Sequence, residues 1–169
     1  MRKGKELEDL FLTLMKQKAK TIKDVREDKN YQAKKVDFIL EGLGTIDVKN
    51  DTHFGSTGNL FVEWEYLFLR SHTIHRCWGH PECEHHAEYF VFYKKETDEF
   101  CFYKAEDYMR GFWQALEDKK VRVGIEHSDD KKSTIYFLFP EKYDNPVEVM
   151  GLMKKQPAAI DEWDDECPW

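Results

Sequence analysis

The sequence lacks any apolar run long enough to cross a bilayer, and its first residues have none of the apolar core of a secretory signal. We therefore expect a cytoplasmic protein without a membrane partner. Cysteines are also few. The four present in 169 residues would be free thiols or metal ligands in a reducing compartment, which excludes a disulfide framework. Internal repeats are absent, and low complexity is confined to the C-terminal end.

An excess of positive charge is missing as well, because 26 Lys and Arg oppose 33 Asp and Glu and leave a net charge of −7. This balance counts against a generic DNA-binding protein, since such proteins tend to be basic. The charge is nevertheless segregated: residues 1–35 contain eleven Lys and Arg against six acids, so this third carries +5 and the remainder −12. The basic third is either a source of phosphate contacts or an ordinary solvated surface.

The composition does supply a core, since 41% of the residues are hydrophobic and 15% are aromatic. We expect one domain over residues 1–155, with a Cys/His-rich loop at 70–87 and an acidic tail over 156–169. The tail has five carboxylates between Asp161 and Glu166. It is either a solubilising end or a DNA mimic that covers the basic third.

Residue periodicity predicts an α/β fold. Apolar residues at 7, 10, 11, 14 and 15 recur at i, i+3 and i+4, which indicates an amphipathic helix from Gly4 to Met15. A second helix is expected over 105–118, and a short one from Asn145-Pro146. Strands are expected at 36–40 paired with 45–49, at 59–66, at 88–93 paired with 99–103, and as a C-terminal hairpin at 121–125 and 134–139.

Three charged residues, Asp37, Asp47 and Lys49, lie in the otherwise apolar hairpin around Glu41-Gly42-Leu43-Gly44. Successive strand residues point to opposite faces, so Asp47 and Lys49 share one face and the apolar residues between them share the other. Charges in such a segment are unfavourable unless they meet a partner or form a site. Two carboxylates suit a hard divalent cation, and an ammonium beside them suits a water or a phosphoryl group.

An Asp on one strand of a hairpin and Asp47-x-Lys49 on the other resembles the core motif of the PD-(D/E)XK nuclease superfamily. Gly4 followed by Glu8 in the first helix is similar to the N-terminal helix of archaeal Holliday-junction resolvases in that superfamily. In this likeness Asp37 takes the place of the first Asp. The resemblance implies a restriction-endonuclease-like αβββαβ core with a mixed sheet, here extended by a C-terminal hairpin and a short helix.

The resemblance also implies an activity: hydrolysis of DNA phosphodiesters with Mg²⁺ or Mn²⁺. Asp37 and Asp47 would hold the metal, with Glu8 and the carbonyl of Val48 completing its shell, and Lys49 would position or activate the attacking water. Junctions, flaps, duplex sites and RNA all stay open as substrates, as do a monomer and a homodimer. The alternative is a non-catalytic protein that keeps the fold and binds nucleic acid or protein.

Several positions compete with these assignments. Val36 stands where the superfamily's Pro would be, and Glu6 is a rival for Glu8. Some nucleases of the superfamily use Glu-x-Glu instead of the lysine motif, which makes Glu63 and Glu65 an alternative pair with Asp47. We prefer the hairpin, because its tight turn accounts for the glycines and it also supplies the lysine. His53 is either a proton donor or an exposed loop residue.

The Cys/His-rich loop is a second candidate site. Cys77, His80, Cys83 and His85 have the ligand types for a tetrahedral Zn²⁺, whose role would be structural, and His75 and His86 are spare candidates. The spacing matches no standard zinc finger, so ordinary thiols and histidines are the alternative. Three further residues of this loop are candidates for substrate contacts: Arg70, Arg76 and Trp78.

Overall fold

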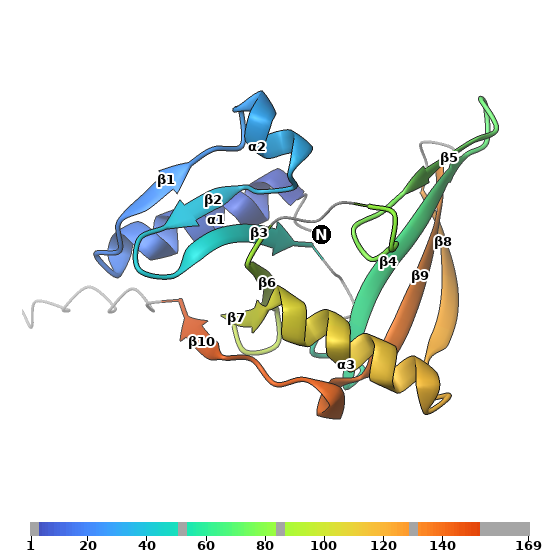
Figure 1. The fold of residues 1–169 in the computed structure, drawn as a ribbon. Helices are drawn as coiled ribbons and strands as arrows, with labels where there is room; N and C mark the ends of the chain where they lie inside the picture. Colours follow the sequence, from blue (N-terminus) through green and yellow to red (C-terminus); the bar gives the residue numbers. More distant parts are fainter. Residues whose placement is uncertain (1–3, 51–53, 84–86, 129–131, 153–169) are drawn as a thin grey trace, which may run out of the picture.

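Two β-sheets and three α-helices make up the computed structural model, which describes residues 4–50, 54–83, 87–128 and 132–152 (Figure 1). The larger sheet has six strands and is mixed, and the smaller has four and is antiparallel. The α/β class and the mixed sheet expected from the sequence are thereby confirmed. Within these residue ranges, no helix combines the length and the apolar character that crossing a membrane requires.

The mixed sheet contains the hairpin that carries the Asp-x-Lys motif. Its strands, in spatial order, are β1 (Ile22–Asp24), β2 (Phe38–Leu40), β3 (Gly44–Lys49), β6 (Tyr89–Lys94), β7 (Glu99–Lys104) and β10 (Glu148–Gly151). β3 and β6 are parallel, whereas the other neighbouring pairs are antiparallel. Because β3 has β2 on one side and β6 on the other, the motif lies inside the sheet rather than at its edge.

The smaller sheet contains, in spatial order, β5 (Thr73–Arg76), β4 (Asn59–Phe68), β9 (Lys132–Pro140) and β8 (Arg122–Ser128). The pairing of β4 with β9 shifts register between Glu63 and Glu65, which marks a β-bulge. At this bulge the carbonyl of Trp64 accepts a hydrogen bond from the Cys77 N–H (2.8 Å), and the carbonyl of Glu63 accepts one from the Gly79 N–H (3.0 Å). The start of the Cys/His-rich loop is thereby fixed against β4.

Helix α1 (Gly4–Gln17) covers one face of the mixed sheet. The spacing of its apolar residues puts four of them on one buried stripe: Leu7, Phe11, Leu14 and Met15. That stripe packs against Ile46 and Val48 of β3. The residues between them, Asp47 and Lys49, therefore face the opposite side of the sheet, as the alternation predicts.

Helix α3 (Ala105–Glu117) covers that opposite side (Figure 1). The Tyr108 hydroxyl donates to the Phe61 carbonyl (2.7 Å) and accepts from the Phe61 N–H (3.0 Å). Since Phe61 belongs to β4, and Phe90 of the mixed sheet packs edge-on against Tyr108, one buried cluster joins the two sheets. The short helix α2 (Lys29–Ala33) precedes β2.

All three predicted hairpins and both long helices form where the sequence places them, but two local predictions were wrong. The strand expected at 59–66 forms as β4, in the second sheet, whereas residues 73–76, expected as part of the Cys/His-rich loop, form β5. No helix begins at Asn145-Pro146. The helical turn is a 3-10 turn at Glu141–Tyr143, after which the chain turns extended. The Val147 N–H donates to the Phe102 carbonyl (2.7 Å), because β7 offers an open edge that β10 completes.

Candidate functional site

Asp37 is fixed by the hairpin that it introduces. It directly precedes β2, and its N–H donates to the Ile46 carbonyl of β3 (2.8 Å). Its side chain then crosses the hairpin, where Oδ2 accepts a hydrogen bond from the Val48 N–H (2.8 Å). The carboxyl group of Asp37 is therefore held beside the backbone segment that presents Asp47 and Lys49.

Asp47 and Lys49 form an ion pair on the strand face that they share, between Oδ2 and Nζ. The pair is largely enclosed, since the Lys49 side chain is 11% exposed and the Asp47 side chain 10%. The Lys49 Nζ also lies 4.4 Å from the ring centre of Trp78 and 5.2 Å from that of Phe90. The ammonium is thus held by one carboxylate and two aromatic faces, an arrangement that restricts where it points.

The two carboxyl groups are close enough to affect each other. Burial raises the pKa of Asp37 to about 7, and the negative charge of Asp47 acts in the same direction. The Val48 N–H and the Lys49 ammonium lower this pKa without offsetting the increase. Near neutral pH the site therefore resists two full negative charges, and a proton or a cation would relieve the repulsion.

The hairpin residues line a pocket of about 290 Å³. The residues that line it come from the region of α2 and from β4 and β5, in addition to the hairpin. Three cationic side chains, those of Arg26, Lys35 and Arg76, line the same pocket as Asp37 and Asp47. An anionic group that entered it would meet these cations close to the paired carboxylates.

Glu8 lies behind this pocket rather than in it. Its Oε2 accepts from Arg26 Nη1 (3.2 Å), and Arg26 also binds Asp9 (2.7 Å) and Asp24 (2.6 Å). The negative charge of Glu8 still raises the pKa of Asp37, so the two are within electrostatic reach. The structure therefore brings Asp37, Asp47 and Lys49 together and places the Arg26 guanidinium against Glu8.

The Glu-x-Glu alternative on β4 is divided by the bulge. Glu63 lines the pocket, and its Oε2 accepts a hydrogen bond from the Tyr66 hydroxyl (3.0 Å). Glu65 instead lies 3.6 Å from His80 Nε2. In a regular strand Glu63 and Glu65 would share a face and Tyr66 would lie on the other, but the extra residue of the bulge reverses this alternation. Glu63 therefore lines the pocket and Glu65 does not, so the two do not act as a pair.

The Cys/His-rich loop forms two consecutive turns. The His80 N–H donates to the Cys77 carbonyl (3.0 Å), and the Cys83 N–H donates to the His80 carbonyl (2.9 Å). His80 Nδ1 accepts from the Glu82 N–H (3.1 Å), and burial raises the pKa of the Cys77 thiol to about 12. In the part of the chain that the structure describes, no three His, Cys, Asp or Glu side chains form a group that could hold a metal. His85 and His86 lie outside those residues, so zinc stays a prediction.

Of the loop residues considered for substrate contacts, Arg76 and Trp78 line the pocket and Arg70 does not. Sequence reasoning missed Arg26 and Tyr66, because neither has a spacing that links it to the hairpin. A signal for Trp78 existed in the glycine that follows it. A Cβ at Gly79 would lie 2.0 Å from Val62 Cγ1, so only glycine lets this loop approach β4 closely enough. His53 and the acidic tail lie outside the described residues.

Comparison with known proteins adds little to this geometry. No family model matches the chain, and no curated protein matches it either. Among solved structures, the chain is similar to a bacterial homing endonuclease at 15% sequence identity and a TM-score of 0.44, over 64% of this chain and 70% of that one. A TM-score this low does not establish a common fold, so the function has to be inferred from the site itself.

Proposed function

We propose that this chain is a divalent-cation-dependent nuclease that hydrolyses phosphodiester bonds of DNA. The observation that carries the proposal is the convergence of Asp37, Asp47 and Lys49 on one pocket, where burial, followed by the charge of Asp47, raises the pKa of Asp37. Carboxyl groups with perturbed pKa values in a pocket are typical of functional sites. If the Asp47–Lys49 ion pair only stabilised the fold, a second buried carboxyl group beside it, that of Asp37, would not be needed.

The donor set fits Mg²⁺ or Mn²⁺. Mg²⁺ is usually held by one or two carboxylates and otherwise by waters and substrate phosphates, and Asp37 and Asp47 provide those carboxylates. A bound cation would neutralise the repulsion that raises the pKa of Asp37. When bound, the ion would polarise the scissile phosphate and stabilise the charge that develops on it. Glu8 would add a further oxygen only after its ion pair with Arg26 opens.

Lys49 would act on the attacking water. Its ammonium is held between Asp47 and the Trp78 ring inside the pocket, so it has few orientations available. An ammonium fixed in a largely enclosed site stabilises developing negative charge better than a mobile one in water. In this proposal Asp47 therefore has two roles, as a metal ligand and as the partner that aims Lys49.

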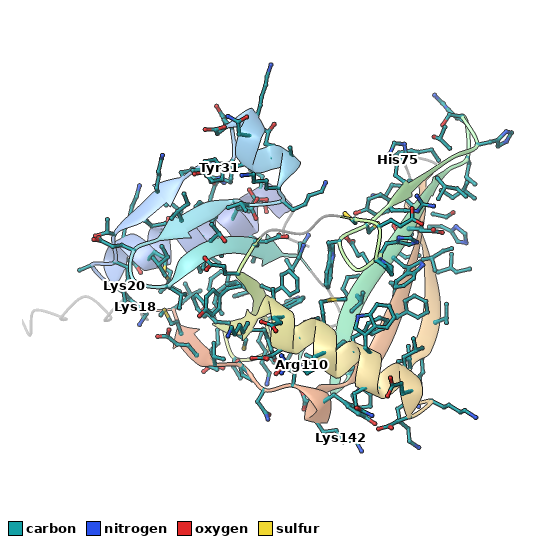
Figure 2. The ribbon with its side chains drawn as sticks, in the orientation of Figure 1. Lys18, Lys20, Tyr31, His75, Arg110 and Lys142 are labelled. Atoms are coloured by element: carbon teal, nitrogen blue, oxygen red, sulfur yellow. The ribbon has the colours of Figure 1, made fainter. Side chains whose placement is uncertain are left out.

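DNA is the proposed substrate because cations surround the carboxylates. Lys35 lines the pocket and would contact a phosphate beside the scissile bond, whereas Arg26 and Arg76 would first have to exchange the carboxylates that they bind in the free chain. Only some of the basic residues in the first 35 positions lie at this pocket. Figure 2 places Lys18 and Lys20 at the end of α1, away from Tyr31 of α2 beside the pocket. Phosphate contacts are therefore expected from single residues, two in the turns around α2 and one on β5, rather than from the whole N-terminal segment.

The proposal is tested with the purified full chain and four substrates: a four-way junction, a flap, a linear duplex and single-stranded DNA. Cleavage is expected in Mg²⁺ or Mn²⁺ and not in EDTA, and the Asp47→Asn variant should lose it. Cleavage of none of the substrates with either metal would contradict the proposal. Retained DNA binding in that case would favour the alternative, a non-catalytic module that binds nucleic acid.

Trp78 provides a more specific prediction. Replacing it by Leu removes the ring over Lys49 Nζ but keeps an apolar side chain, and we expect the cleavage rate to fall about tenfold, since a desolvated cation–π contact contributes on the order of 1 to 2 kcal/mol. Trp78→Phe should retain most of the activity. The measurement is single-turnover cleavage in Mg²⁺, with DNA affinity in Ca²⁺ unchanged.

The matched control for Trp78 is Trp113→Leu on α3. Trp113 is 37% exposed and packs edge-on against Trp64, with a separation of 6.1 Å between ring centres, and it does not line the pocket. Its replacement should leave the cleavage rate unchanged. Equal losses in the two Leu variants would show that the effect comes from stability and not from the orientation of Lys49.

A further inference from the structure

Strand β8 is the edge of the second sheet, and within the described ranges it has a strand neighbour on one side only, β9. Two large apolar side chains on it are well exposed, Val123 at 65% and Ile125 at 59%. Exposed apolar edge strands pair readily with other strands, and native proteins usually protect them. The backbone and the exposed side chains of β8 are therefore suited to pairing with an additional strand at its free edge.

The exposed pair lies on the α3 side of the sheet. Val123 is opposite Phe137 and Ile125 is opposite Ile135 in the β8–β9 ladder, and directly opposed residues share a face. Phe137 packs against Phe112 of α3, with 5.7 Å between ring centres. The covered part of this face thus ends at β9, and Val123 and Ile125 extend the same apolar face beyond it.

The sequence of β8 is complementary to itself in antiparallel orientation. Arg122 and Glu126 are each two residues from Gly124, and Val123 and Ile125 are each one residue from it. Two copies of β8 paired antiparallel about Gly124 would set each Arg122 opposite a Glu126 and each Val123 opposite an Ile125. Within its own chain Arg122 is opposite Leu138 and Glu126 is opposite Thr134, neither of which is charged.

Gly124 at the centre of this arrangement removes a steric obstacle. A Cβ there would lie 2.3 Å from Cζ of Tyr136, so the Tyr136 ring packs directly over the glycine backbone. Gly124 does not have a positive φ, so its backbone conformation does not require a glycine. At the centre of the pairing each chain would therefore contribute backbone only, with the Tyr136 ring over it.

We propose that the protein forms a homodimer in which β8 pairs antiparallel with β8 of a second copy about Gly124. The two four-stranded sheets would then join into one continuous sheet with two-fold symmetry. Arg122 would pair with the partner subunit's Glu126, and Val123 would pack on the partner subunit's Ile125. Symmetry repeats both contacts, so each interface has two charge pairs and two apolar pairs.

Charge reversal tests this pairing without DNA or metal, so the result is independent of the proposed nuclease activity. The full chain should have twice its chain mass of 20.3 kDa by sedimentation equilibrium. Arg122→Glu alone and Glu126→Arg alone each place like charges opposite one another twice, and each should weaken dimerisation by at least about tenfold. The double variant, Arg122→Glu with Glu126→Arg, should restore it.

An equimolar mixture of the two single variants provides the sharpest arm, because a dimer with one chain of each would have opposite charges at both positions. We expect the mixture to dimerise as the unmodified chain does. A monomeric unmodified chain, or single variants that dimerise as well as it, would overturn the proposal. If a variant misfolds, a mixture of Val123→Cys and Ile125→Cys chains should form a disulfide-linked dimer on oxidation, and its absence would equally overturn the pairing.

Discussion

Replacing Lys49 with methionine is expected to lower the rate of DNA cleavage by about 100-fold or more while DNA binding in Ca²⁺ persists. The methionine keeps the apolar contacts with Trp78 and Phe90 but removes the ammonium that Asp47 holds in the pocket. Loss of a fixed group that stabilises developing charge typically costs about 3 kcal/mol in the transition state, which corresponds to this change in rate. The measurement is single-turnover cleavage in Mg²⁺.

A control substitution and a stability measurement separate chemistry from stability. Lys20, exposed and remote from the pocket, serves as a matched control, and Lys20→Met should leave cleavage unchanged. Lys49→Met also leaves the buried Asp47 without its cation, so the free energy of unfolding should fall by about 2 kcal/mol. Cleavage at the original rate by a folded Lys49→Met variant would remove Lys49 from the proposed mechanism.

The hairpin site was predictable because its determinants are local. Strand alternation puts Asp47 and Lys49 on one face, and a short turn brings Asp37 beside them, so no distant contact is needed to form the group. The amphipathic stripe of α1 was equally accessible, since its spacing alone selects the face that packs on Ile46. Where one face of an element is buried, short-range periodicity identifies it.

The rest of the pocket depends on long-range pairing. β4 does not join the mixed sheet but pairs with β9, more than sixty residues later in the sequence. The residue periodicity within β4 does not indicate which of the two sheets it joins. The bulge between Glu63 and Glu65 reverses the alternation that would have kept these two residues together. Likewise, Arg26 contacts Glu8 because the tertiary fold brings the turn after β1 close to α1, and the spacing of the two residues in the sequence does not indicate this.

Trp78 illustrates the same limit at the site itself. The loop that carries it was predictable as a candidate for substrate contact, but its position over Lys49 was not. That position requires the bulge carbonyls of Glu63 and Trp64 as hydrogen-bond acceptors and a glycine at 79. A loop residue that contacts Lys49 from another part of the chain leaves no mark in the spacing of the motif that contains Lys49.

Replacing Asp37 with asparagine is expected to abolish cleavage and at the same time to stabilise the folded protein at alkaline pH. Burial and Asp47 raise the pKa of Asp37 from 3.8 to about 7, so the folded state favours the protonated carboxyl. That contribution to stability is fully present below pH 3.8 and is lost as the pH rises through 7. Asparagine stays neutral throughout and keeps an oxygen for the Val48 N–H.

The gain in the free energy of unfolding should therefore grow with pH, from about 2 kcal/mol at pH 5 to about 4 kcal/mol at pH 8, and then level off. Denaturant unfolding without divalent cations measures it, and Glu117→Gln, which neutralises an exposed carboxyl of α3, should change little. Added Mg²⁺ should stabilise the unmodified chain and not Asp37→Asn, because only the former offers two carboxylates to the ion. A pH-independent gain would show that the pKa of Asp37 is not raised in the folded protein, and equal stabilisation of both proteins by Mg²⁺ would place the cation elsewhere.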